Sequence, residues 1–134
     1  MLSRPIATLL LAGGLPLALL GCPAPTAPSD VALGAEFALA PGESAVAGDD
    51  GFLVTFESVT EESRCPMDAL CIVPGRVVLD VSAGRGLRRV ALSPGDVATV
   101  ESHRLRLVQV EPYPSAAQPI PSSAYRATFV VERP

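Results

Sequence analysis

The sequence predicts an all-β domain, a single antiparallel β-sandwich or barrel of about seven strands with one disulfide loop. Apolar and polar residues alternate along several short segments, which is the pattern of half-buried strands. Turns rich in Gly, Pro and Asp separate these segments at intervals of roughly eight to twelve residues. A helical period is nearly absent, and a single turn at residues 67–70 is the one helix-like stretch that we expect.

Three segments predict strands most clearly: residues 52–57, 77–82 and 125–131. In each of them every second residue is apolar and faces one side of a sheet. The first follows an Asp-Asp-Gly turn. A Gly-Arg-Gly turn at residues 84–86 joins the second to a further strand at 87–92, which predicts a β-hairpin.

Weaker patterns predict strands near residues 37–39 and 44–47, and another strand is expected at 105–110. The alternation along the last of these changes parity at Val108. Because an extra residue in one strand shifts the side-chain period by one, we expect a β-bulge there.

The first 21 residues have the parts of an export signal. Arg4 supplies a positive charge, and residues 6–20 form an apolar stretch shorter than the about 20 residues that cross a bilayer. The run Leu19-Leu20-Gly21-Cys22 resembles the lipobox of bacterial lipoproteins. The resemblance implies cleavage before Cys22 and attachment of a diacylglycerol to its thiol. The alternative is an ordinary signal peptide cut near Ala18, which would leave Cys22 as a free or paired thiol.

This interpretation divides the chain into a signal peptide (1–21), a Pro-rich tether (22–30) and a β domain (31–134). Pro-rich segments favour extended polyproline and act as stiff spacers. Two or three acyl chains hold a protein firmly on a membrane, since each buried methylene contributes about 0.8 kcal/mol. We therefore expect export from the cytoplasm and anchoring by lipid at the cell envelope, at the outer membrane of a Gram-negative cell.

The cysteine count favours a disulfide. Lipidation of Cys22 leaves Cys65 and Cys71 as an even pair in an oxidising compartment. A bridge between them closes a loop of about seven residues and contributes about 2 kcal/mol on the chain-entropy model. The alternative is a soft site for Cu(I) or Zn formed by these two thiolates with Met67 and the only histidine, His103. The chain has no second Cys pair and the spacing is longer than in a zinc knuckle, so we predict no metal and no other cofactor.

The charge balance argues against nucleic acid as a partner. The chain has a formal net charge of −4, and every basic residue is Arg. Removal of residues 1–21 takes away Arg4 and no acidic residue, which leaves −5. A modestly acidic body lacks the basic face that nucleic acid requires, and it gives no electrostatic help in binding anionic lipids.

A second resemblance lies in the disulfide region. Residues 62–66 (Glu-Ser-Arg-Cys-Pro), Cys71, Gly75 and residues 111–114 (Glu-Pro-Tyr-Pro) are similar to a family of small secreted bacterial proteins of undetermined function. That family has Asp-Ser-Arg-Cys-Pro, a second Cys, an aliphatic residue, Trp-Ala-Gly and a Pro-Tyr-Pro segment before its last strand. This chain departs from it with Glu62 for the Asp and with Val-Pro for the Trp-Ala. The resemblance implies a secreted or lipid-anchored β domain with a disulfide, and it implies no activity.

No catalytic signature stands out, so the chain is not predicted to be an enzyme. The Asp-Asp-Gly run at 49–51 could begin a calcium-binding loop, but Asp-Gly is a common turn and no series of calcium ligands follows it. Ser102 and His103 are neighbours in the sequence, but the chain has no Gly-x-Ser-x-Gly motif that would mark a catalytic serine. Exposed acidic and Arg residues are more often solvated than functional. Glu61 and Glu62 with Asp68 could supply paired catalytic carboxylates, and Arg88, Arg89, Arg104 and Arg106 could form an anion-binding patch.

The candidate binding surface consists of Arg64, Met67 and Tyr113. The Pro-rich connection at 112–121 is longer than most loops, and Tyr113 offers a large rigid contact surface there. The alternative for this connection is a strap over a sheet edge. We expect Arg64 to fix the disulfide loop by donating to loop carbonyls, with ligand contact as the alternative.

The sequence therefore predicts a lipid-anchored, non-enzymatic binding module of the cell envelope. Its partners are the membrane, through the anchor, and an envelope protein or polymer. The alternative is a periplasmic metal-handling lipoprotein for copper or zinc.

Overall fold

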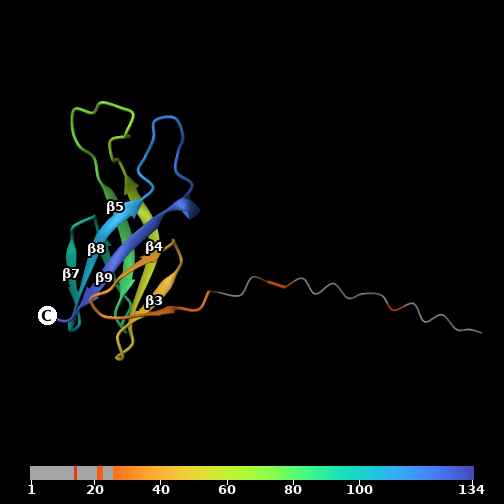
Figure 1. The fold of residues 1–134 in the computed structure, drawn as a ribbon, viewed down its shortest axis with the longest axis vertical. Coiled ribbons are helices and arrows are strands. Elements are labelled where there is room, and N and C mark those ends of the chain that lie inside the picture. The colour runs from red at the N-terminus through yellow and green to blue at the C-terminus, as the bar shows by residue number, and fades with distance from the viewer. Residues whose placement is uncertain (1–13, 15–20, 23–25) are drawn as a thin grey trace, which may run out of the picture.

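The structure, a computed structural model, describes residues 14, 21–22 and 26–134. The predicted signal peptide lies almost entirely outside these residues, whereas Cys22 is described and exposed. Within the described part, the chain folds into nine β-strands in two sheets with one disulfide, so the all-β prediction is confirmed (Figure 1). No helix there is long and apolar enough to span a bilayer.

The five-stranded sheet has the order β1-β3-β4-β5-β6, and the four-stranded sheet has the order β2-β9-β8-β7. Neighbouring strands are antiparallel except β1 and β3, which pair in parallel. A short 3-10 helix, Ser122–Ala124, precedes the last strand. The strands are β1 (Ser29–Val31), β2 (Glu36–Leu39), β3 (Ser44–Ala47), β4 (Phe52–Glu62), β5 (Val77–Ala83), β6 (Arg88–Leu92), β7 (Val97–Val100), β8 (His103–Glu111) and β9 (Arg126–Glu132).

One hydrophobic core lies between the two sheets. Along residues 52–57 of β4 the buried residues alternate with half-buried ones, as the sequence predicts. In β9 the alternation is interrupted at Val130, which is buried like the residues on both sides of it. Three phenylalanines fill the centre, and the Phe129 ring lies 5.9 Å from the Phe37 ring and 6.5 Å from the Phe56 ring. Phe37 and Phe129 are register partners within the four-stranded sheet, whereas Phe56 belongs to the five-stranded sheet, so the Phe56–Phe129 contact joins the two sheets. Complete burial of such a side chain contributes roughly 1.5–3 kcal/mol.

Two strands were not expected from the sequence, and both are short. β1 begins at Ser29, inside the stretch predicted as tether, and it pairs with β3. β7 has one fully buried residue, Val100, while Val97 is half exposed. Such segments have no clear alternation and are added to the sheets by pairing with longer strands. The predicted helical turn at 67–70 is a single hydrogen-bonded turn from Pro66 to Ala69.

Bulges explain where the alternation in the sequence changes. The register between β8 and β9 shifts between Leu107 and Gln109, which confirms the bulge predicted at Val108. β4 has two shifts against β5, one between Phe56 and Ser58 and one between Val59 and Glu61. Each shift exchanges the two faces of the strand. The sequence pattern therefore ends near residue 57, whereas the strand continues to Glu62.

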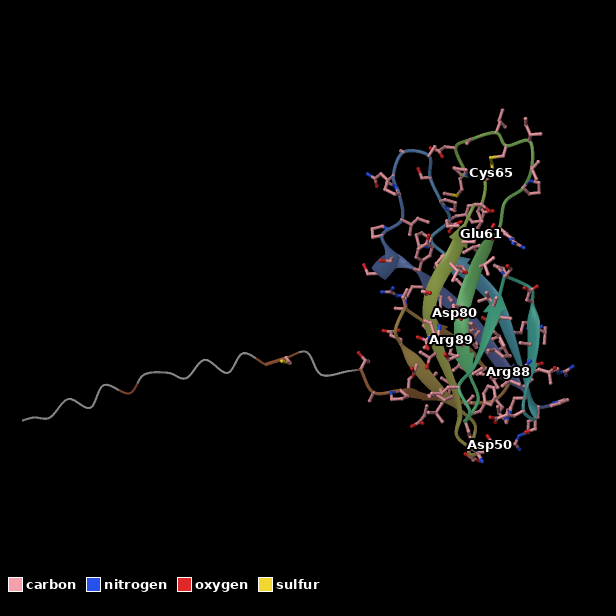
Figure 2. The ribbon with its side chains drawn as sticks, turned by 180° about the vertical axis from the view of Figure 1, so that it is seen from behind. Asp50, Glu61, Cys65, Asp80, Arg88 and Arg89 are labelled. Atoms are coloured by element: carbon pink, nitrogen blue, oxygen red, sulfur yellow. A yellow bond between two sulfur atoms is a disulfide. The ribbon has the colours of Figure 1, made fainter. Side chains whose placement is uncertain are left out.

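The fold gives the domain two distinct ends. The disulfide loop and the Pro-rich connection lie side by side at one end (Figure 1). Figure 2 shows Cys65 at that end and Asp50 at the other. The strand that follows the tether, β1, pairs with β3, which in turn pairs with the first residues of β4. The disulfide loop follows the last residue of β4, so the tether enters the domain away from the two loops.

Gly75 closes the base of the disulfide loop by close backbone contact. A Cβ at this position would lie 1.5 Å from the carbonyl oxygen of Ser63. Next to this contact the Ser63 amide donates to the Arg76 carbonyl at 2.8 Å. Only a residue without a side chain allows the two backbone segments to approach in this way.

We predict that Gly75→Ala lowers the free energy of unfolding by about 3 kcal/mol or more, because backbone must move at the base of the loop. Gly86→Ala is the matched control: a Cβ there meets nothing within 4 Å, and we expect a change within about 0.5 kcal/mol. Urea denaturation of both variants measures the difference. Equal free energies of unfolding for the two variants would show that the backbone at the base of the loop moves without loss of stability, which would contradict the prediction.

Candidate binding site

The Arg64 guanidinium joins the two sheets at the loop end. Its side chain is buried, and it forms a bidentate pair with Glu62, with Nε–Oε1 at 2.8 Å and Nη2–Oε2 at 2.5 Å. It also donates to the carbonyls of Val110 at 2.8 Å and Pro112 at 3.0 Å. Glu62 ends β4 and Val110 lies near the end of β8, so one side chain connects both sheets and the start of the Pro-rich connection.

Glu62 is held in its charged form by this arrangement. Burial raises its pKa, but the hydrogen bonds and the charge of Arg64 outweigh burial and bring the pKa below the ordinary 4.5. The Tyr125 hydroxyl donates to Glu62 Oε2 at 3.1 Å. Burial and then the Glu62 charge raise the pKa of Tyr125. The pair therefore has a third, neutral partner from the segment before β9.

Further hydrogen bonds make the two loops one unit. We call residues 64–74 the Cys loop and residues 112–121 the Tyr113 segment. The Met67 amide donates to the Pro114 carbonyl at 3.1 Å, and the Ala116 amide donates to Asp68 Oδ1 at 2.8 Å. The hydrogen bond from Ala116 lowers the pKa of Asp68. Each loop thus supplies donors and acceptors to the other, and neither depends on its own residues alone.

The predicted disulfide is confirmed, with Cys65 and Cys71 bonded and their Cα atoms 5.9 Å apart. The loop it closes cannot fold back on itself, and its aliphatic side chains point into solvent. Met67 is 74 % exposed, and Leu70 and Ile72 are fully exposed. Scattered exposed aliphatic residues are common, but a run of them on one stiff loop is typical of an interaction surface.

Leu70, Ile72 and Val73 are at least 73 % exposed on the Cys loop. They are not among the three residues named for the candidate surface, which takes Arg64 and Met67 from this loop. Their signal is present in the sequence, because apolar residues flank Cys71 in a loop too short to bury them.

An open groove of about 940 Å³ runs between the loops and the strand ends. The three residues of the candidate binding surface, Arg64, Met67 and Tyr113, lie on its wall. The Tyr113 ring is half exposed, and the Arg64 guanidinium lies 4.8 Å from its centroid. The groove is lined by Arg64, Met67, Gly75, Arg76, Val77, Ser93, Pro94, Gln109, Val110, Glu111, Pro112, Tyr113, Ala124 and Arg126.

The three predicted binding residues thus have different roles. Arg64 uses all three guanidinium nitrogens within the protein, so it positions the loops, while Met67 and Tyr113 present surface. The carbonyls that Arg64 binds belong to the end of β8 and the Tyr113 segment rather than to its own loop.

The donors proposed for a metal site do not come together. Cys65 and Cys71 are bonded to each other, and His103 stacks on Phe52, with ring centroids 4.3 Å apart. Phe52 is the first residue of β4, and the Cys loop begins after the last residue of the same strand. Because a strand rises 3.2–3.4 Å per residue, His103 beside Phe52 is on the order of 30 Å from the two cysteines. Among the described residues no group of three His, Cys, Asp or Glu side chains is placed to hold a metal ion.

His103 instead belongs to a cluster at the other end of the domain. Its Nε2 lies 3.2 Å from Asp50 Oδ2, which lies 3.2 Å from the Arg133 guanidinium. Ser102 Oγ is 3.5 Å from His103 Nδ1. The His103 ring is 2 % exposed, so it is covered from any substrate. Through Arg133, this cluster connects the end of the chain to Asp50 in the turn before β4.

The four arginines considered as an anion patch do not form one surface on one sheet. Arg88 and Arg89 lie on β6 of the five-stranded sheet, and Arg104 and Arg106 lie on β8 of the other. Arg89 pairs with Asp80, as Figure 2 shows on the face of the sheet. Asp80 lies diagonally across from Arg89 on the neighbouring strand β5, and such a cross-strand pair needs no ligand to explain it.

Comparisons with protein-family models, with curated proteins and with solved structures found no match for this chain.

We predict that Arg64→Met lowers the free energy of unfolding by about 3–5 kcal/mol, because it leaves a partly buried carboxylate and two carbonyls without their donor. Arg76→Met is the matched control, since Arg76 pairs with Glu61 in solvent with side chains 69 % and 41 % exposed. Exposed pairs contribute about 0–1 kcal/mol. Denaturant titration compares the two, and equal losses would contradict the central role of Arg64.

The domain is expected to lose stability in acid through Glu62. Because its pKa is below 4.5 in the folded chain and ordinary in the unfolded chain, the unfolded chain takes up the proton first. The contribution is present above about pH 4.5 and disappears as the pH falls through the folded pKa. Glu62→Gln should flatten the fall of unfolding free energy with pH below that value. An unchanged slope in the variant would contradict this assignment.

Proposed function

We propose that this chain is a lipid-anchored protein of the cell envelope whose β domain is a non-enzymatic binding module. The observation that carries the proposal is the loop end, where Met67 and Tyr113 line the groove and the Cys loop also exposes Leu70 and Ile72. Both loops are stiffened before any partner arrives, by the disulfide, by several Pro residues and by the hydrogen bonds between them. Little conformational entropy is then lost on binding.

Three further observations support the proposal. The lipobox resemblance ends at Cys22, which is exposed. The tether enters at β1, away from the loop end, so an anchor at Cys22 would leave the loops facing away from the lipid. The resemblance to the family with Asp-Ser-Arg-Cys-Pro also implies a secreted or lipid-anchored domain.

The core shared by two separate sheets supports a sandwich rather than a barrel.

Lipidation predicts a specific mature N-terminus. Mass spectrometry of protein from a native membrane fraction should find Cys22 as the first residue, carrying acyl chains. Cys22→Ser should release the protein from membranes, and Ser29→Ala is the matched control. An unmodified mature chain that begins elsewhere would contradict the anchor while leaving the binding module open.

Partner capture should depend on the exposed loop residues and not on stability. Met67→Ala and Tyr113→Ala should each reduce cross-linked capture of an envelope protein or polymer at least threefold, with melting temperatures within about 2 °C of the parent. Leu87→Ala is the control, because Leu87 is 53 % exposed on the turn before β6, outside the groove. If both loop variants unfold early and capture falls only in proportion, the loops are structural straps.

A further inference from the structure

The charges around the groove are separated across the base of the Cys loop. Arg64 and Arg76 line the groove, while their partners Glu62 and Glu61 line a second hollow. Arg76 is 69 % exposed and presents its charge to the groove, whereas Arg64 is buried and adds positive charge there without free donors. The chain as a whole is acidic, with a formal net charge of −4, so this segregation is local and not a consequence of composition.

Arg126 adds a third guanidinium from the opposite sheet. Its Nη1 donates to the carbonyls of Ser123 and Tyr125 at 2.9 and 2.8 Å. No carboxylate among residues 26–134 forms an ion pair with it, although Glu111 is its register partner on β8. Glu111 is the only acidic residue on the groove wall, against three arginines. An arginine with free donors beside an apolar surface is well suited to a carboxylate.

The shape of the groove favours an extended chain over a small molecule. Most of its lining residues are exposed, whereas small-molecule sites enclose most of the ligand surface. Its exposed apolar wall includes Met67, Pro94, Pro112 and Tyr113. Aliphatic side chains can pack on this wall while carboxylates at neighbouring positions reach the arginines.

We propose that the groove binds an extended peptide segment that carries both carboxylate and aliphatic side chains, with Arg126 as the residue that selects the carboxylate. The inference rests on the proposed function and names the chemistry of its partner. The arginine–carboxylate contact supplies selectivity, and the packing on Met67 and Tyr113 supplies affinity that neutral and acidic peptides share.

The test uses the mature chain, residues 22–134, with Cys22→Ser, and three fluorescein-labelled ten-residue peptides. Each peptide has two Leu in a Gly-Ser background and three residues that are Glu, Gln or Lys. Fluorescence anisotropy should show the Glu peptide binding at least tenfold more tightly than the Gln peptide, and no saturable binding of the Lys peptide. The preference should fall in 0.5 M salt, where the Debye length is about 4 Å.

Variants separate the two contributions. Arg126→Gln should reduce the Glu-over-Gln preference to less than threefold, while Tyr113→Ala should weaken both peptides by a similar factor. Arg104→Gln is the matched control, because it removes the same charge from an exposed β8 position outside the groove. A Glu peptide that binds no better than the Gln peptide, or an unaltered preference in Arg126→Gln, would overturn the assignment.

Two outcomes separate this inference from the proposed function. If no peptide binds but Tyr113→Ala still abolishes capture from the envelope, the binding module stands and the acidic-peptide partner is wrong. If the Cys22→Ser chain instead binds phosphatidylcholine vesicles, and Leu70→Asp alone abolishes this, the loop end is a membrane contact and the inference is overturned.

Discussion

The contacts of Arg64 determine the arrangement of the loop end. Strands β4 and β8 belong to different sheets, and both end where the guanidinium lies. By pairing with Glu62 and donating to the carbonyls of Val110 and Pro112, it fixes the distance between the strand ends. The Tyr113 ring then lies against the same guanidinium, and the amide of Met67 reaches the carbonyl of Pro114. Each later contact requires the sheets to be at this separation.

A charged side chain suits this position for a physical reason. Backbone carbonyls at strand ends lose their ladder partners, and an unpaired buried carbonyl is costly. Arg offers five N–H donors in a planar fork, so one residue satisfies two carbonyls and a carboxylate together. Lys would provide a point charge without the fork. The disulfide and Gly75 shape the Cys loop, but Arg64 connects that loop to the other sheet.

Much of the fold could be predicted from the sequence, and little of the site. Alternation along residues 52–57 and 125–131 identified strands because a sheet face imposes a period of two. It did not identify β1 and β7, which are too short to show a period, or the end of β4, where bulges invert it. The two carbonyls that Arg64 binds are 46 and 48 residues away, and only the packing of the two sheets brings them near. Leu70 and Ile72 could have been recognised, since a short disulfide loop cannot bury them.

The two ends of the domain suit different tasks for the same chain. At the end near Asp50, the buried His103 and the Arg133 guanidinium both lie 3.2 Å from one carboxylate oxygen, Asp50 Oδ2. Asp50 Oδ1 and His103 Nε2 are buried there without a hydrogen-bond partner. At the loop end Arg64 satisfies the buried carboxylate and carbonyls, and the exposed apolar side chains and the Arg126 guanidinium are the groups that we propose for a partner. Since the tether enters through β1, away from this surface, anchoring and the proposed binding do not compete for the same residues.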